Sequence, residues 1–126
     1  MSDNYSLIIK NGNCYINGKL TKIDIALSGN KIKKIGKIEL NSSKVFDATD
    51  KVVLPGIIDT QTHFREPGST DVEDLESGSR AAVLGGITSV FEMPNTNPPT
   101  SNLIEFDKKL QLAKERMHSN YAFYFG

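Results

Sequence analysis

The sequence has 126 residues, 38% hydrophobic and 24% charged, which suits one modest soluble domain and excludes a disordered or collagen-like chain. Fifteen basic and fifteen acidic residues cancel, so no net charge favours nucleic acid or an anionic membrane as a partner. The start lacks a basic region followed by an apolar core, and no apolar run is long enough to cross a bilayer, so we expect a cytoplasmic protein.

Residues 5–50 have the pattern of short strands separated by tight turns. The dipeptides Asn11-Gly12, Asn17-Gly18 and Gly29-Asn30 each follow a short strand-like run and are favoured in hairpins. This pattern predicts a small antiparallel sheet. Residues 31–38 alternate apolar and basic side chains, which favours an edge strand with one wet face over a nucleic-acid patch.

Residues 52–68 form the stretch around which the chain is organised. The apolar residues 52–54 and 57–58 resemble a strand that is buried on both faces, and Pro55-Gly56 interrupts it. Beyond this point side chains should alternate between the two faces of the strand. One face would then collect an acid, an amide, an imidazole and a guanidinium, from Asp59, Gln61, His63 and Arg65.

Residues 70–125 alternate between helical and strand patterns. Residues 70–73, Thr-Asp-Val-Glu, form a capping box, and apolar residues recur at helical spacing until Gly85-Gly86. A strand is expected at 87–91, a polar loop at 92–99, a second helix from Thr100 or Ser101, and another strand at 121–125. The buried side of the second helix is predicted to carry Leu103, Phe106, Leu110, Ala113 and Met117. Strands and helices in this order predict parallel strands joined by crossovers.

Three segments resemble the opening of dihydroorotases, in the cyclic amidohydrolase superfamily. They are Gly56-Ile57-Ile58-Asp59 through His63-Phe64-Arg65-Glu66-Pro67-Gly68, residues 81–88, and Met93-Pro94-Asn95-Thr96-Asn97-Pro98. Allantoinases are similar but generally have Asn at the position of Arg65 and a different residue at that of Asn95. Both residues therefore favour dihydroorotase.

The resemblance implies an α/β fold and covers nearly the whole chain. Residues 1–54 are similar to the small antiparallel β-domain that precedes the metal-dependent barrel in these enzymes. Residues 55–126 would be the first βαβαβ units of a (β/α)8 TIM-like barrel, which would be incomplete in this chain because such a barrel takes roughly 250 residues.

The resemblance also implies an activity, the interconversion of N-carbamoyl-L-aspartate and dihydroorotate in pyrimidine biosynthesis, with one or two Zn²⁺ ions. His63 would be a metal ligand at the carboxyl end of a barrel strand. Arg65 would bind the substrate carboxylate in a bidentate manner, and Asn95 would bind the same group. Gln61 stands where the family has another histidine, and a neutral amide is a poor zinc ligand, so its role in metal binding is doubtful.

Several alternatives stay open from the sequence. Asp59 could orient a ligand or serve the strand end, and His118 could favour a helix C-terminus or be simply exposed. The family's remaining ligands and its proton-shuttle aspartate lie further along, so no catalytic residue is assigned within this chain, which should be inactive alone. The alternative function is a non-catalytic amidohydrolase-like remnant or assembly subunit. Beyond a small-molecule substrate, partners could be further copies of the chain or an aspartate carbamoyltransferase.

Overall fold

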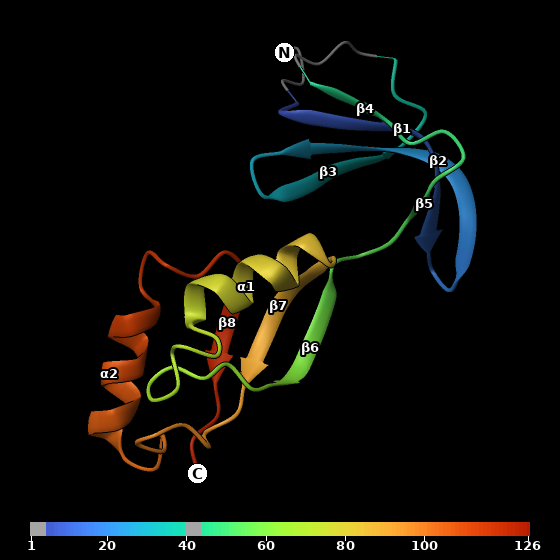
Figure 1. Cartoon of the computed structure of the whole chain (residues 1–126). Coiled ribbons are helices and arrows are strands. Elements are labelled where there is room, and N and C mark those ends of the chain that lie inside the picture. Colours follow the sequence, from blue (N-terminus) through green and yellow to red (C-terminus); the bar gives the residue numbers. More distant parts are fainter. Residues whose placement is uncertain (1–4, 40–43) are drawn as a thin grey trace. The chain divides into compact units, whose positions relative to one another are not determined.

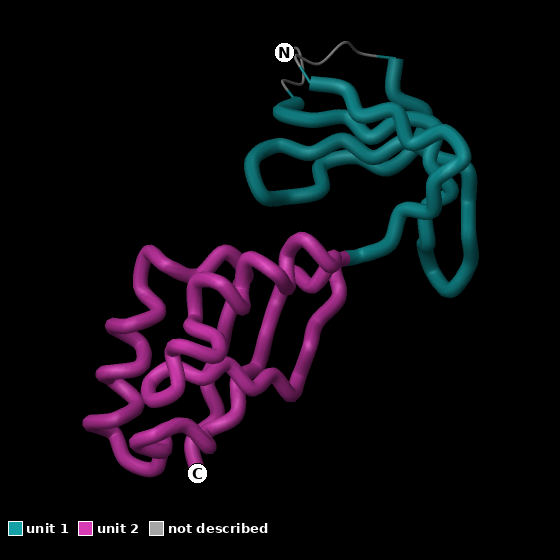
Figure 2. Tube along the Cα trace, viewed as in Figure 1, with its two compact units in different colours: residues 1–55 teal, residues 56–126 magenta. Residues whose placement is uncertain are grey.

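The computed structural model describes residues 5–39 and 44–126, and the chain divides into two compact units. Unit 1 is Met1–Pro55 and unit 2 is Gly56–Gly126 (Figure 2). Within the described ranges, no helix combines the length and the apolar character that crossing a membrane requires.

Unit 1 is a five-stranded sheet in the order β3-β2-β1-β4, with β5 also paired to β1 (Figure 1). The strands are β1 (Leu7–Ile16), β2 (Lys19–Ser28), β3 (Lys31–Gly36), β4 (Val45–Asp47) and β5 (Val52–Val53). The predicted antiparallel pairing is found among β1, β2 and β3, but the prediction does not hold for β4 and β5, which both pair with β1 in parallel. β1 is long enough for two short strands to share its second edge.

The two Asn-Gly dipeptides of unit 1 behave differently. Asn17-Gly18 forms the predicted hairpin between β1 and β2, with φ of 50° and 82°, values that a type I′ turn requires. Asn11-Gly12 does not turn the chain, so that prediction is wrong. β1 continues through it with a register shift between Ile9 and Gly12, and Asn11 donates its backbone N–H to Oδ1 of Asp24 at 3.0 Å.

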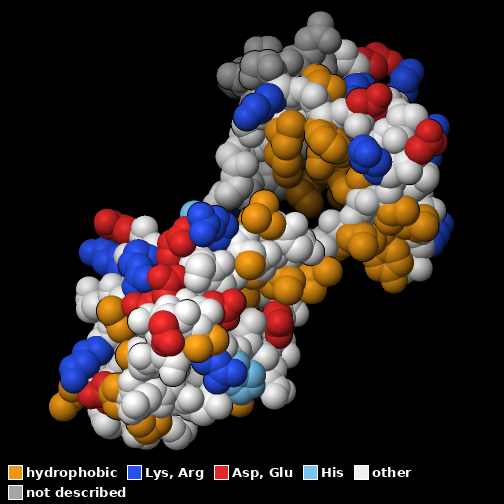
Figure 3. Space-filling view, in the orientation of Figure 1, with side chains coloured by type: hydrophobic (Ala, Val, Ile, Leu, Met, Phe, Trp, Pro, Cys, Tyr) orange, Lys and Arg blue, Asp and Glu red, His pale blue; other side chains and the backbone are white. Residues whose placement is uncertain are grey.

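Strand β3 lies at the edge of the sheet, as predicted. The prediction that only one face of this strand is exposed to solvent is wrong. Ile32 and Ile35, on its apolar side, are 59% and 46% exposed. These two side chains line an apolar hollow of about 230 Å³ within unit 1, together with Tyr15 and Leu54. Hydrophobic side chains are visible over this unit in Figure 3.

Unit 2 contains three parallel strands, in the order β6-β7-β8, and two helices (Figure 1). Its elements are β6 (Ile57–Thr62), α1 (Leu75–Leu84), β7 (Ile87–Glu92), α2 (Leu103–Ala113) and β8 (Asn120–Phe123). The predicted alternation of parallel strands and helices is confirmed. The core of the unit is formed by Phe64, Leu75, Val90 and Ala113.

Helix α1 begins later than the sequence predicts. The capping box is formed by Asp74 and Ser77, whose backbone N–H donates to Oδ1 of Asp74 at 2.7 Å, and not by residues 70–73. Residues 69–73 instead form turns, in which the N–H of Val72 donates to the carbonyl of Ser69. The predicted end of the helix is confirmed, since Gly85 is its C-cap.

Helix α2 follows Asn102, whose side chain caps it by accepting from the N–H of Glu105 at 3.0 Å. Its predicted buried side is wrong at Leu103, which is 72% exposed, and correct at Ala113, which is fully buried. Phe106, Leu110 and Met117 are half-buried. A residue that the prediction omitted, Lys109, is fully buried on this helix.

Candidate functional site

The candidate site lies where β6 and β7 end beside each other. Thr62 and Glu92 are register partners at the carboxyl ends of these parallel strands. The N–H of Met93 donates to the carbonyl of Thr62 at 2.9 Å, so the loops that follow the two strands begin side by side. In parallel α/β sheets, ligands bind at this end of the strands.

His63 and Asn95 come together in this place, one from each loop. Nδ1 of His63 lies 3.0 Å from Oδ1 of Asn95. An amide oxygen can only accept, so this contact assigns the proton to Nδ1 of the neutral imidazole and leaves the lone pair of Nε2 available. Metal-binding histidines commonly have this arrangement, in which the second ring nitrogen donates to an oxygen.

Arg65 and Asn95 share a small polar hollow. The hollow has a volume of about 110 Å³, and its lining includes Arg65, Ser69, Asn95, Thr96 and Asn97. A backbone hydrogen bond of 3.0 Å from Asn97 to the carbonyl of Pro67 ties the two loops together. Arg65 and Asn95 therefore line one space, and a guanidinium with an amide is a combination that suits a planar anion.

The polar residues predicted to share one face of β6 are not brought together by the alternation of side chains along a strand. β6 has a register irregularity between Asp59 and Thr62, and His63 and Arg65 lie beyond its end. The carboxylate of Asp59 accepts from the backbone N–H of Gln61 at 2.9 Å, which is a local strand-end role. His63 and Arg65 are gathered by the loop after β6 and not by a shared strand face.

Among the described residues, the candidate metal ligands are too few to form a metal site by themselves. Over residues 5–39 and 44–126, no group of three or more His, Cys, Asp or Glu side chains is placed to hold a metal ion. Nε2 of His63 fits the chemistry of a zinc ligand, whereas the exposed amide of Gln61 is a weak candidate. His63 and Gln61 could therefore contribute to a metal site but would not form it alone.

A buried ion pair includes the last residue of β7, which directly precedes the loop that carries Asn95. Glu92 ends β7, Lys109 comes from α2, and both side chains are fully buried with the Lys109 ammonium against Oε2 of Glu92. Burial raises the pKa of Glu92 to about 7, although the contact with Lys109 and weaker electrostatic interactions with His63 and Arg65 lower it. The carboxylate is thus held in an environment that disfavours its charge.

Sequence reasoning missed this pair. The sequence predicts a polar loop that begins at Glu92, and Lys109 is not among the residues predicted for the buried side of its helix. Charged residues are rarely fully buried, so residue type alone does not indicate either position. One signal could have found Lys109, because it lies three residues after Phe106 and four before Ala113, on the apolar spacing of the helix.

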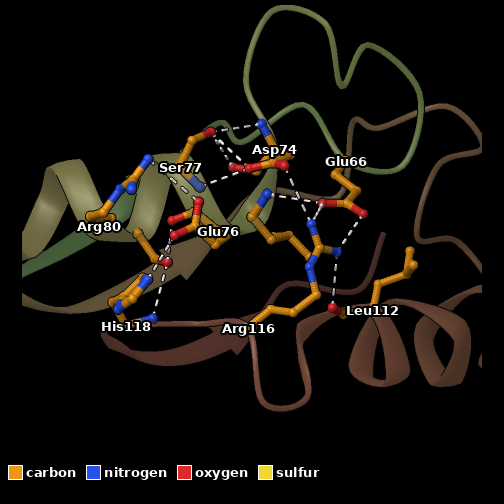
Figure 4. A network of polar contacts seen from close by, with 10 residues as sticks. Glu66, Asp74, Glu76, Ser77, Arg80, Leu112, Arg116 and His118 are labelled. Carbon is orange, nitrogen blue, oxygen red and sulfur yellow. Dashed lines mark hydrogen bonds and ion pairs between the residues drawn. The ribbon is translucent and has the colours of Figure 1, made fainter.

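Glu66 of the Glu-Pro-Gly turn has a structural role (Figure 4). Arg116 binds it with two hydrogen bonds, of 2.7 Å to Oε1 and 3.0 Å to Oε2, and Oε2 also accepts from the N–H of Leu75 at 3.0 Å. Hydrogen bonding to Glu66 raises the pKa of Arg116, which is also close to Asp74. Glu66 therefore fixes the turn after Arg65 to the start of α1 and to the segment after α2.

His118 lies outside the candidate site. It follows the end of α2 by several residues and is exposed, so it is not a charge on the last turn of a helix. Its Nε2 is 2.9 Å from Oε1 of Glu76 (Figure 4). Its backbone N–H donates to Oγ of Ser79. Both contacts join the chain after α2 to α1.

In (β/α)8 barrels the active site lies at the carboxyl ends of the parallel strands, and His63, Arg65 and Asn95 follow such strand ends in unit 2. Residues 52–126 match the model of the amidohydrolase family, and the chain belongs to that family.

The relatives indicate where in this family the chain lies. A dihydroorotase from Lactobacillus gasseri is 42% identical over 118 residues, which are 94% of this chain and 27% of that protein. An allantoinase from Salmonella choleraesuis is 42% identical over 114 residues, covering 90% of this chain and 25% of that protein. The structure of L-hydantoinase (dihydropyrimidinase) from Arthrobacter aurescens has a TM-score of 0.87 and 31% identity, over 97% of this chain and 28% of that one. The chain thus resembles dihydroorotases over most of its own length and spans about a quarter of the curated relatives it matches.

Proposed function

We propose that this chain is the amino-terminal portion of a dihydroorotase, which interconverts N-carbamoyl-L-aspartate and dihydroorotate in pyrimidine biosynthesis. One observation carries the proposal: Arg65 and Asn95, from two neighbouring strand ends, line one polar hollow, and His63 contacts Asn95 at its border. Residues 1–54 would be the small β-domain, and residues 55–126 the first βαβαβ units of a (β/α)8 barrel.

The hydrogen bonding of Asn95 supports a role in binding a carboxylate. Oδ1 of Asn95 is used by His63, which leaves its amide nitrogen as a donor. Arg65 offers a planar, permanently charged fork to the same hollow. Together they would bind the carboxylate of dihydroorotate, with Arg65 in bidentate contact.

The proposed cofactor is Zn²⁺, as one or two ions. A bound Zn²⁺ activates a water at neutral pH and polarises the amide carbonyl. Nε2 of His63 would hold the ion in this part of the chain, and Asn95 would keep the imidazole in the tautomer that can do so. Gln61 would contribute weakly, and the remaining ligands would have to come from outside these residues.

Arg65 favours dihydroorotate over allantoin as the substrate. Allantoin has no carboxylate, so it would leave the guanidinium of Arg65 without a charged partner in the hollow. The complete protein that contains this chain should therefore hydrolyse dihydroorotate and leave allantoin unchanged, measured with each substrate and added Zn²⁺. Hydrolysis of allantoin but not of dihydroorotate would refute the proposal.

The alternative is a non-catalytic amidohydrolase-like remnant or assembly subunit, and the observation that favours it is Gln61 in place of the family histidine. An inactive complete protein in which Gln61→His restores zinc binding would support the alternative. We further propose a cytoplasmic protein that forms homo-oligomers or binds an aspartate carbamoyltransferase. Sedimentation of the complete protein, with and without that enzyme, would test both partners.

A further inference from the structure

We propose that Lys109 is a positioning residue, whose buried ammonium holds the loop at residues 93–100 and thereby keeps the amide of Asn95 against His63. The inference concerns a residue of α2 that does not itself line the polar hollow. It rests on the proposed function only for what Asn95 binds, since the positions of the loop and of His63 can be measured without substrate.

The contacts of Lys109 are distributed along this loop. Its Nζ pairs with Glu92 before the loop, lies 3.4 Å from the carbonyl of Met93, and lies 3.5 Å and 3.3 Å from Oγ1 of Thr96 and Thr100. The ammonium has three N–H donors for these four oxygens, so at least one donor is shared. It reaches the start, the middle and the end of the segment. The loop adds a hydrogen bond of its own, of 2.8 Å, from Thr100 to the carbonyl of Pro94.

Packing alone does not explain a lysine at this position. Its side chain is fully buried, and replacing a buried ion pair by apolar residues of similar volume is often neutral or stabilising. An apolar side chain could fill the space beside Phe123, whose ring centre lies 5.2 Å from Nζ. It could not donate to Met93, Thr96 or Thr100. The contacts from α2 to these three residues are what the ammonium adds to the backbone hydrogen bond from Asn97 to Pro67.

The loop position determines the contact at the candidate site. Asn95 lies between Met93 and Thr96, both of which Nζ contacts. The Asn95–His63 hydrogen bond is 3.0 Å long, and a displacement of about 1 Å would place it outside hydrogen-bonding distance. Releasing the loop should therefore free Nδ1 of His63 and turn the Asn95 amide away from Arg65.

The decisive variant is the double substitution Glu92→Gln with Lys109→Met. It removes both charges while keeping similar volumes, so no unpaired charge is left buried. The matched control is Glu105→Gln with Lys108→Met, because these residues form a 2.8 Å ion pair at the surface of the same helix. Within the described residues, the side chains of Glu105 and Lys108 form this ion pair and no hydrogen bond or ion pair to the loop.

The readout is the tautomer of His63, from the ¹⁵N chemical shifts of its imidazole at about pH 8, where an ordinary imidazole is neutral. The chain has two histidines, so His118 serves as an internal reference. We expect His63 to carry its proton on Nδ1 in the wild type and in the control. In Glu92→Gln/Lys109→Met it should move toward the Nε2–H form, with His118 and the amides of unit 1 unchanged.

An unchanged His63 tautomer in a folded Glu92→Gln/Lys109→Met variant would overturn the proposal. If that variant unfolds, Thr100→Val replaces it, because this change removes one acceptor of Lys109 without altering any charge. Thr100→Val should shift His63 in the same direction by a smaller amount, and no shift would again overturn the proposal. If the complete protein fails to bind dihydroorotate but the tautomer shifts, the positioning role stands and the proposed function falls.

Discussion

Nδ1 of His63 lies 3.0 Å from Oδ1 of Asn95, although 32 residues separate the two in the sequence. The hydrogen bond joins the candidate metal ligand to a candidate substrate-binding residue. The direction of the hydrogen bond leaves Nε2 of His63 and the amide nitrogen of Asn95 unused by it. Under the proposed function, Nε2 would bind a metal and the amide nitrogen would bind an anion.

Gly78→Ala should destabilise the fold. An added Cβ would lie 2.5 Å from Cδ1 of Phe64, a buried core residue between His63 and Arg65. Overpacking of this kind costs about 1–3 kcal/mol, which should outweigh the gain of about 1 kcal/mol from a better helix former. Urea unfolding would measure the change.

Gly85→Ala is the matched control for Gly78→Ala, since its added Cβ would meet nothing closer than 3.4 Å and its φ is −82°. Its free energy of unfolding should stay within about 0.5 kcal/mol of wild type. Equal effects of the two substitutions would show that Phe64 does not constrain α1.

The stability of the fold should decrease as the pH rises from about 4.5 to about 7. Burial raises the pKa of Glu92 from its ordinary value of 4.5 to about 7, so in this window the folded chain retains a proton that the unfolded chain releases. The stabilisation from this retained proton is fully present below the unfolded pKa of Glu92, 4.5, and is lost once the pH has risen to about 7. Asp24 affects stability at more acidic pH, because its pKa is lowered in the folded chain. Burial alone would raise this pKa, but the hydrogen bonds from Asn11, Ile38 and Lys10 outweigh the effect of burial.

The variant Glu92→Gln/Lys109→Met should lack this dependence, since both charges of the pair are gone. Urea midpoints of wild type and variant, measured between about pH 5 and 7.5, would give the difference. Parallel curves would mean that Glu92 does not titrate in this window.

Arg116→Met should destabilise unit 2 by about 1–3 kcal/mol. The side chain of Glu66 is only 9% exposed, and without Arg116 it would keep the hydrogen bond from the Leu75 N–H but lose its charged partner. The control is Arg80→Met, because the Arg80–Glu76 pair is exposed and 3.6 Å long, and exposed pairs contribute at most about 1 kcal/mol. Thermal unfolding of both variants would test the difference, and equal losses would contradict a special role for Glu66.

The sequence predicts those parts of the fold that local residues determine. Asn17-Gly18 and Asn11-Gly12 carry the same local turn signal, but only the first reverses the chain. The second is drawn into β1, where Asp24 accepts the N–H of Asn11. That carboxylate belongs to another strand, so no local pattern around Asn11 could have revealed the bulge.

The residues in and around the candidate site also divide into those that the sequence identifies and those that only the structure reveals. His63, Arg65 and Asn95 could be selected because an imidazole, a guanidinium and an amide follow apolar strands, and the structure brings His63 and Arg65 each to Asn95. The buried pair of Glu92 and Lys109 could not be selected by residue type, because the burial of each charge depends on the other. Whether two charged residues are buried against each other can be seen only when the fold brings them together.

The 126-residue chain should have no measurable dihydroorotase activity by itself. At the candidate site it offers one imidazole, since His118 is paired with Glu76 elsewhere in unit 2. Catalytic zinc sites have three protein ligands. The test is hydrolysis of dihydroorotate with added Zn²⁺ by chain purified from a host that lacks its own dihydroorotase, and turnover there would contradict the prediction.

Arg65→Lys in the complete protein should weaken dihydroorotate binding and leave the metal content unchanged. Arg65 is a fixed cation that cannot bind Zn²⁺, but its planar fork matches a carboxylate as a lysine ammonium cannot. Losing the bidentate contact should cost on the order of 1.5–3 kcal/mol, about ten- to a hundredfold in affinity. Substrate titration and metal analysis of the same samples would measure both quantities.

Asn95→Ala should act in the same direction, and the double variant should lose less affinity than the sum of the single losses, because both side chains would bind one carboxylate in the hollow that they share. Asn95→Ala should also release Nδ1 of His63. Of the two single substitutions, only Asn95→Ala is therefore expected to lower the zinc content. If Arg65→Lys removes the metal and leaves substrate affinity intact, the roles assigned to the two strand ends are reversed. Full additivity would place Arg65 and Asn95 on different groups of the substrate.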